Sequence, residues 1–80
     1  AEWVRYNAVW ALGCIRDGRA YDPLIKMLDD DSANVRRITV ETLGTFGDPR
    51  AVPALQKRLS DDKDRSVRDA AHVALQLLGR

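Results

Sequence analysis

Few side chains in this 80-residue sequence could carry out chemistry, and they stand far apart. The chain has one cysteine, Cys14, and one histidine, His72. A single cysteine cannot form an internal disulfide, and one cysteine with one histidine supplies too few ligands for a structural zinc site. There is no Gly-x-Ser-x-Gly motif, no glycine-rich phosphate loop, and no acid and base pair on one helix face. The sequence therefore predicts no catalytic residue, no metal site and no cofactor. No histidine or basic residue is spaced to activate the Cys14 thiol, so we expect Cys14 to be a small, partly buried residue between helices.

Two acidic runs resemble the ligands of hard cations. They are Asp-Asp-Asp at 29–31 and Asp-Asp-Lys-Asp at 61–64. Neither has the glycine and the distant glutamate of an EF-hand loop. Both runs come just before a segment with helical periodicity, where the helix dipole favours carboxylates. We expect these aspartates to cap helices and to face solvent.

Aromatic residues gather on one side of the first predicted helix. On a helical wheel, Trp3, Tyr6 and Trp10 lie with Asn7 and Cys14, opposite the apolar stripe. Exposed Trp and Tyr are typical of recognition hot spots because they offer a large contact area at low entropy cost. The alternative is that Trp3 and Tyr6 pack on a preceding structural unit.

The same registers of the later long helices extend this surface. The predicted partner-binding residues are Trp3, Tyr6, Asn7, Trp10, Asn34, Arg37, Ile38 and Glu41. The last long helix contributes Ser66, Asp69, Ala70, Val73 and Leu77 to the same predicted surface.

An internal repeat positions these side chains. Val4-Arg5, Ala8, Ala11-Leu12-Gly13, Asp17, Ala20, Leu24 and Leu28 recur 31 positions later as Val35-Arg36, Thr39, Thr42-Leu43-Gly44, Asp48, Ala51, Leu55 and Leu59. A third copy starts 32 positions after the second, with Val67-Arg68, Ala71, Ala74-Leu75 and Leu78. The sequence therefore predicts stacked units rather than a small closed globule.

Each copy has the spacing of a helix. One helical face is predicted at Val4, Ala8, Ala11, Leu12 and Ile15, and the next at Val35, Thr39, Thr42, Leu43 and Phe46. Ser32 and Asp64 are predicted N-caps, and Gly47 a C-terminal cap. Pro23 and Pro53 predict irregular or 3₁₀ first turns in the shorter helices. We expect an all-α fold of five helices, at about 3–15, 19–29, 33–46, 49–60 and 65–78, with antiparallel neighbours and no strand.

The unit resembles the HEAT repeat, in the short bacterial and archaeal type of the phycobilisome bilin lyases. The shared pattern is Val-Arg-x-x-Ala-x-x-Ala-Leu-Gly, followed by Asp and then by Ala and Pro-x-Leu, and it covers essentially the whole chain. The resemblance implies an α-solenoid of about two and a half repeats. Residues 1–80 would form one domain, with a half repeat at 1–17 and repeats at 18–47 and 48–80.

The resemblance also implies roles for the helices and for the repeated arginines. The Val-Arg helices would line a concave side, and the shorter proline-containing helices a convex side. Arg5, Arg36 and Arg68 would pair with loop aspartates in a structural ladder between units, with Asp17 and Asp48 at the matching positions.

The two ends of the sequence differ. Ala1 stands where the other copies have Ser32 and Asp64, and no short helix precedes Trp3. We therefore expect a C-terminal fragment of a longer solenoid. The region of Trp3, Val4 and Ala8 should leave apolar surface uncovered, which promotes self-association. At the other end, Val9 and Val40 correspond to His72, and Gly13 and Gly44 correspond to Gln76, which predicts a polar, solvent-facing terminal helix.

Charge and hydropathy limit the class of partner. Thirteen Lys and Arg stand against twelve Asp and Glu, which argues against a dedicated nucleic-acid binder. No apolar run approaches the roughly 18 residues of a membrane span, and no signal peptide is recognisable, so we expect a cytoplasmic protein. The predicted function is a non-catalytic protein-interaction scaffold that binds a protein partner through the concave side. The alternatives are a bilin lyase or lyase-like accessory subunit, which the resemblance permits, and a nucleic-acid-binding solenoid.

Overall fold

The computed structural model describes residues 1–15 and 17–79. The elements are α1 (Glu2–Ile15), η1 (Gly18–Ala20), α2 (Tyr21–Met27), α3 (Ala33–Phe46), η2 (Pro49–Ala51), α4 (Val52–Asp61) and α5 (Arg65–Leu77). None of the described residues lies in a strand. The all-α prediction and the five predicted helices are confirmed, each within two residues of its expected bounds when the 3₁₀ turns are counted with the short helices.

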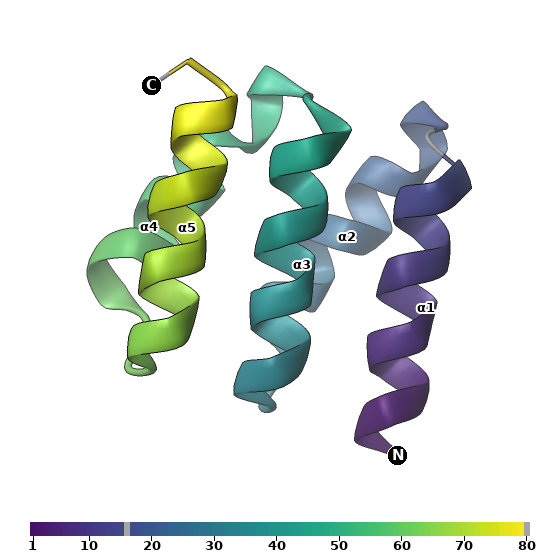
Figure 1. The fold of residues 1–80 in the computed structure, drawn as a ribbon. Coiled ribbons are helices and arrows are strands. Elements are labelled where there is room, and N and C mark those ends of the chain that lie inside the picture. The colour runs from purple at the N-terminus through teal and green to yellow at the C-terminus, as the bar shows by residue number, and fades with distance from the viewer. Residues whose placement is uncertain (16, 80) are drawn as a thin grey trace.

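The helices form two layers (Figure 1). The long helices α1, α3 and α5 lie side by side and run in the same direction, with α3 packed between the other two. The short helices α2 and α4 lie behind them and return the chain to the start of the next long helix. This is the stacked arrangement of an α-solenoid. Each helix in the described ranges is too short or too polar to cross a membrane.

The helix boundaries follow the predicted capping residues. The Ser32 hydroxyl accepts from the backbone N–H of Val35, and the Asp64 carboxylate accepts from that of Ser66. These bonds satisfy backbone donors that lack a partner within the first turn of a helix. Gly47 ends α3 in the left-handed conformation, with φ of 82°. The 3₁₀ turns η1 and η2 precede the short helices, as the prolines predicted.

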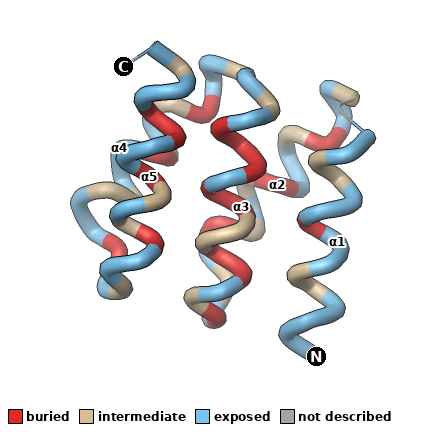
Figure 2. Tube along the Cα trace, viewed as in Figure 1, coloured by how far each residue is buried: buried red, intermediate tan, exposed pale blue. Residues whose placement is uncertain are grey.

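The core lies between the two layers and is centred on α3 and α5 (Figure 2). The predicted stripe positions of these two helices are buried, apart from the partly buried Phe46 and Leu78 at their ends. The fully buried members include Val35, Thr39, Leu43, Val67 and Ala71. The short helices close the core from behind with Leu24 and Leu55, both 0% exposed.

The apolar stripe of α1 is largely uncovered, as expected at Val4 and Ala8 but not at Ala11 and Ile15. Val9 is the buried residue of α1, whereas Val4 and Ile15 are 52% and 64% exposed, and Ala8 and Ala11 are exposed as well. The equivalent positions of α3 and α5 are covered by α2 and α4, the short helices that precede them. No short helix precedes α1 in the described structure, so α1 contacts its neighbours mainly through the side that faces α3.

Glycine allows close contact between neighbouring long helices. A Cβ atom at Gly44 would lie 2.8 Å from Ala74 Cβ and 2.9 Å from Ala74 Cα. A Cβ atom at Gly13 would lie 2.6 Å from Thr42 Cγ2. The equivalent position in α5 is Gln76, which is exposed, as is His72. The predicted change from a close-packed face to a polar face is therefore confirmed.

Candidate functional site

An arginine–aspartate ladder joins the loops at the N-terminal ends of the long helices. Arg5 donates from Nε and Nη2 to the Asp30 carboxylate, at 2.7 and 3.1 Å. Arg36 donates to the Asp62 carboxylate at 2.9 and 3.2 Å, and from Nη1 to the backbone carbonyl of Asp30 at 2.8 Å. Arg68 donates to the backbone carbonyl of Asp62 at 2.6 Å. Each loop aspartate thus binds the arginines of two successive long helices.

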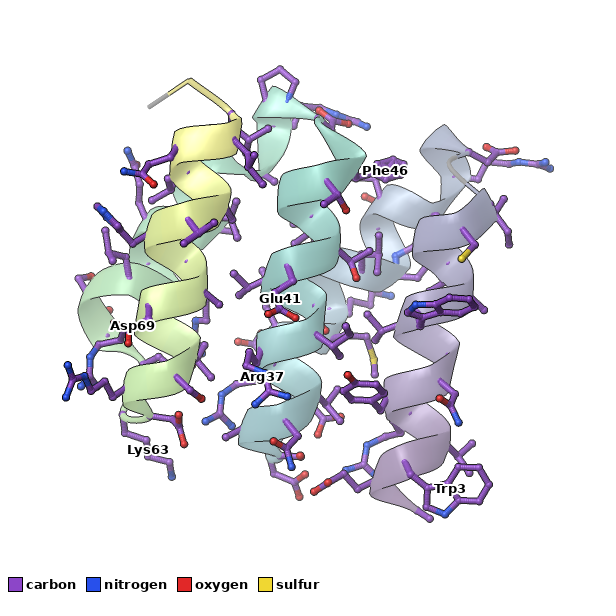
Figure 3. All side chains as sticks on the ribbon, viewed as in Figure 1. Trp3, Arg37, Glu41, Phe46, Lys63 and Asp69 are labelled. Atoms are coloured by element: carbon purple, nitrogen blue, oxygen red, sulfur yellow. The ribbon has the colours of Figure 1, made fainter. Side chains whose placement is uncertain are left out.

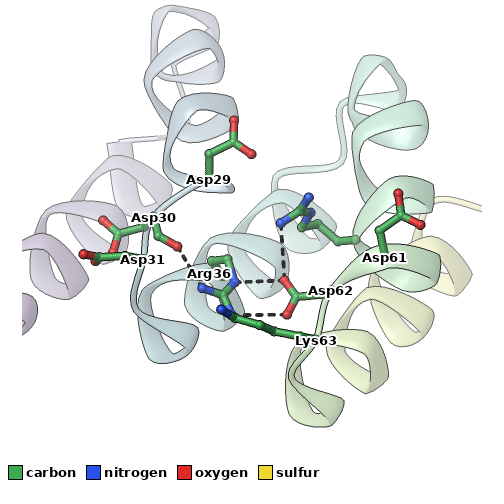
Figure 4. A pocket seen from close by; sticks show the side chains of 8 residues that line it. Asp29, Asp30, Asp31, Arg36, Asp61, Asp62 and Lys63 are labelled. Atoms are coloured by element: carbon green, nitrogen blue, oxygen red, sulfur yellow. Dashed lines mark hydrogen bonds and ion pairs between the residues drawn. The ribbon is translucent and has the colours of Figure 1, made fainter.

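The middle of the ladder is buried (Figure 4). The side chains of Arg36 and Asp62 are only 7% and 1% exposed. The Asp62 carboxylate also accepts from the backbone N–H of Asp64 at 3.0 Å and from Arg58 Nη1 at 3.4 Å. This charge pair is compensated by several hydrogen bonds, as a buried ion pair must be.

The predicted ladder needs one correction. Arg5, Arg36 and Arg68 are ladder residues, but Asp17 and Asp48 are not. Asp17 caps η1 and pairs with Arg19 at 2.8 Å, and Asp48 caps η2 and pairs with Arg50 at 2.6 Å. The reason is distance: Asp17 lies beyond the C-terminal end of α1, whereas Arg5 lies in its first turns, and the ten residues of helix from Arg5 to Ile15 span about 15 Å.

Hydrogen bonding in the ladder shifts the acidity of its carboxyl groups. The hydrogen bond from Arg5 holds the pKa of Asp30 below its ordinary value. Burial alone would raise the pKa of Asp62, but the hydrogen bonds from Arg36 and from the Asp64 backbone lower it, and the net direction is downward. Both carboxylates are therefore stabilised in their charged form.

The acidic runs have a structural role in this ladder. Asp30 and Asp62 are the second residues of the two runs, and Asp64 is the cap of α5. Within the described ranges, no three His, Cys, Asp or Glu side chains are grouped so as to hold a metal ion. The prediction of capping is thus confirmed for Asp64, but the full solvent exposure expected for Asp62 is wrong because its carboxylate is buried against Arg36.

The outward side of α1, α3 and α5 forms an exposed surface, which we call the long-helix face (Figure 3). It contains the predicted partner-binding residues. Trp3 and Trp10 are 67% and 61% exposed. Asn7, Asn34 and Glu41 are exposed, Arg37 is partly buried, and Tyr6 and Ile38 are partly buried against the core. Of the eight, Trp3, Arg37 and Glu41 are labelled in Figure 3, and Tyr6 and Ile38 are less available for contact because they pack against the core.

A polar chain fixes part of the long-helix face. Asn34 Nδ2 donates to Glu2 Oε1 at 3.3 Å, and Arg37 Nη1 donates to Asn34 Oδ1 at 3.3 Å. These bonds connect α1 to α3. They hold the amide of Asn34 and the guanidinium of Arg37 in place on the long-helix face.

A groove of about 410 Å³ lies between α3 and α5 on the same face. We call it the α3–α5 groove. Its lining is mainly apolar at Ala70, Val73, Ala74 and Leu77, with Thr45 on the opposite wall. Arg37, Glu41, Ser66 and Asp69 also line it. Val73 and Leu77 are 54% and 61% exposed, so the groove offers apolar surface to solvent.

The cysteine Cys14 and the histidine His72 do not form a site together. Cys14 is exposed, so the expectation of a partly buried thiol is wrong. It lies with Trp10 and Thr42 beside a shallow hollow of about 240 Å³. The helices α1 and α3 approach each other at the neighbouring Gly13, and this contact leaves Cys14 exposed to solvent. His72 is exposed on α5, as predicted.

The spacing between the ladder carboxylates and the arginines that follow them in the sequence indicates which aspartates belong to the ladder. Arg36 follows Asp30 by six positions, and Arg68 follows Asp62 by six positions. This offset accompanies the second and the third of the three Val-Arg pairs. The apolar groove residues Ala70, Val73 and Leu77 belong to the surface predicted from the last long helix, but the sequence did not single them out as partner-binding residues.

Comparisons with known proteins agree with this architecture. Residues 1–76 match the family described as HEAT repeats. The phycocyanobilin lyase subunit alpha of Nostoc sp. is 34% identical over 84 aligned positions, which take in 94% of this chain and 30% of that protein. An uncharacterized phycocyanin operon protein Z of Pseudanabaena tenuis is 31% identical over 72 positions, covering 90% of this chain and 35% of that protein.

The chain spans about one third of the length of these relatives. The family match, in contrast, includes α1 through almost all of α5. The repeated Val-Arg helices, the two-layer stack and this match show that the chain belongs to the HEAT repeats family.

Proposed function

We propose that this chain is a non-catalytic protein-interaction scaffold that binds a protein partner through the long-helix face. The observation that carries the proposal is the exposure of Trp3 and Trp10, at 67% and 61%, on the same face as Arg37. Trp, Tyr and Arg are the residues most enriched in binding hot spots. Glu41 and Asp69 place negative charge on this surface, so it does not favour nucleic acid.

The mechanism is rigid display. The side chains of the face come from parallel helices. The opposite sides of α3 and α5 are packed in the core, α1 is packed against α3, and Arg37 is held by Asn34. Little conformational entropy is then lost when a partner binds, which increases the net affinity. HEAT repeats are suited to this role because stacked units form an extended surface.

Replacement of Trp3, Trp10 and Arg37 by alanine tests this function. We expect the triple variant to lose partner capture by at least about tenfold, since hot-spot truncations each cost about 2 kcal/mol or more. Tyr6 is left unchanged because it packs against the core. The measurement is quantitative capture of proteins from lysate by the immobilised chain, with circular dichroism to confirm that the variant folds.

A matched control carries three alanines on the short helices, at Lys26, Gln56 and Lys57. These side chains are exposed on the other layer and should leave capture unchanged. Equal capture by the long-helix-face variant and the wild type would show that the binding surface lies elsewhere.

The second candidate function is that of a bilin lyase subunit. The supporting observation is the 34% identity to the Nostoc protein named phycocyanobilin lyase subunit alpha. Incubation with phycocyanobilin separates the two functions. The scaffold function predicts an unchanged visible absorption spectrum of the pigment, whereas a shift that depends on folded protein would favour the lyase function.

A further inference from the structure

The α3–α5 groove has a shape that limits what can occupy it. Its base is closed where Gly44 allows α3 to approach Ala74 of α5. Its walls include Val73 and Leu77, and its volume is about 410 Å³. A buried Leu-sized side chain occupies a volume on the order of 100 Å³, so the groove has room for a short row of apolar side chains rather than for a whole polypeptide segment.

The backbone of α3 and α5 favours a helical partner over an extended one. An extended peptide needs hydrogen-bond partners for its own backbone, and β-strand addition supplies them from an exposed sheet edge. The backbone groups along the middle of α3 and α5 are already bonded within their helices. A helix satisfies its own backbone and presents only side chains, so it can cover the apolar walls without leaving polar groups unpaired.

Charge favours a basic partner. The lining carries two carboxylates, Glu41 and Asp69, and one guanidinium, Arg37. Arg37 donates to Asn34, and Asp69 lies 3.7 Å from Arg65 Nε. Among the described side chains, none forms an ion pair with Glu41. A cationic side chain next to the apolar row of a partner would therefore meet an available carboxylate, and an acidic one would be repelled.

We propose that the α3–α5 groove binds an amphipathic, basic helix of a protein partner. Its apolar residues, spaced i, i+3 or i+4, and i+7, contact Val73 and Leu77, and a lysine or arginine lies beside Glu41. The groove extends from Ser66 to Leu77, which is about 16 Å of helix, so it accommodates about three turns of the partner. This inference rests on the proposed function, because it names the class of partner for part of the long-helix face.

A phage-displayed library of random 16-residue peptides, selected on the immobilised chain, tests this proposal. We expect the enriched peptides to have apolar residues at helical spacing and a net positive charge. Binding of the best peptide, labelled with fluorescein and measured by anisotropy, should weaken at least tenfold in Val73→Asp. The matched control, His72→Asp, places the same carboxylate on an exposed position of the same helix outside the groove and should bind like the wild type.

Charge reversal gives a second measurement that does not depend on the fold of Val73→Asp. Selection on Glu41→Lys should enrich peptides with acidic residues in place of the basic ones. Enriched peptides with strand-like alternation, peptides of unchanged charge on Glu41→Lys, or no enrichment would each overturn the proposal. A dimer of the wild type that Val73→Asp abolishes and His72→Asp does not, as measured by sedimentation, would also overturn it, because a second copy would then be the occupant.

The result is distinguishable from failure of the proposed function. Peptides that bind Val73→Asp normally but are lost on alanine replacement of Trp3 and Trp10 would reject the groove and keep the long-helix face as a binding surface. Capture that survives both sets of substitutions would reject both.

Discussion

Asp62→Ala is expected to lower the free energy of unfolding by about 3–5 kcal/mol, because it leaves the charge of Arg36 buried without its counter-ion. The Arg36 side chain is only 7% exposed, and the lost carboxylate also accepts from Arg58 and from the Asp64 backbone. An 80-residue protein has a total stability of about 4–12 kcal/mol. The variant should therefore be largely unfolded or melt at a much lower temperature, as measured by urea and thermal unfolding.

Two further variants test whether the loss of stability comes from the unpaired buried charge of Arg36 rather than from the loss of any carboxylate in this loop. Asp61→Ala removes an exposed neighbouring carboxylate and should change stability by no more than about 0.5 kcal/mol. The double variant Arg36→Met, Asp62→Leu removes both charges and should be more stable than Asp62→Ala alone. If Asp62→Ala unfolded at the same denaturant concentration as Asp61→Ala, the ladder would have no structural importance.

The stability lost in Asp62→Ala should also depend on pH. The pKa of Asp62 is lower in the folded chain than its ordinary value, so folding is favoured by its ionised form. This contribution is complete above the unfolded pKa of about 3.9 and is lost as the pH falls through the lower folded value. The stability difference between the wild type and Asp62→Ala should therefore shrink in unfolding experiments as the pH is lowered from neutral to below about 4.

The sequence was sufficient for the features that depend on short-range order. Helix bounds followed from apolar spacing and from caps such as Ser32, Asp64 and Gly47, whose hydrogen bonds are made within a few residues. The stacked fold followed from the repeat, because units with the same apolar stripe bury it on one another. Helical register decides which side of its own helix each predicted partner-binding residue occupies, and their role in binding stays a prediction.

The predictions that were wrong concern features that depend on contacts between helices and loops. The partners of Arg5 and Arg36 lie 25 and 26 residues away, and a choice between Asp17 and Asp30 requires the direction of each helix in space. The exposure of Ile15 depends on which helix covers α1, which periodicity cannot show, whereas the exposure of Val4 was expected because no short helix precedes it. For the same reason Cys14 could not be placed, because its exposure depends on how closely α1 approaches α3. The self-association expected from the apolar edge of α1 stays a prediction.

The structural residues and the proposed recognition residues are separated on the same helices. The ladder arginines occupy the first turns and point toward the loops, whereas Arg37 and Glu41 point outward from the long-helix face (Figures 3 and 4). Adjacent residues such as Arg36 and Arg37 therefore have different roles: the first is buried against Asp62, and the second lines the α3–α5 groove. Substitutions at Arg37 can change binding without removing a ladder contact.

Gly44→Val is expected to destabilise the chain by about 1–3 kcal/mol, since added atoms must displace a well-packed neighbour. The first added atom alone would lie 2.9 Å from Ala74 Cα, which is backbone, so α5 must move away from α3 rather than rotate a side chain. Valine gains little helix propensity over glycine to offset this cost. Thermal unfolding should show a lower midpoint, by about 4–8 °C for each kcal/mol lost in a domain of this size.

Gly18→Val is the matched control, because no atom lies within 4 Å of the Cβ that it would add. Its midpoint should stay close to that of the wild type, and Gly44→Ala should fall between the two, since the helix propensity of alanine offsets up to about 1 kcal/mol of the clash. A Gly44→Val midpoint equal to that of Gly18→Val would mean that α3 and α5 are not held in close contact. Because this contact forms the base of the α3–α5 groove, peptide binding in the groove should weaken in Gly44→Val even at temperatures where the variant is folded.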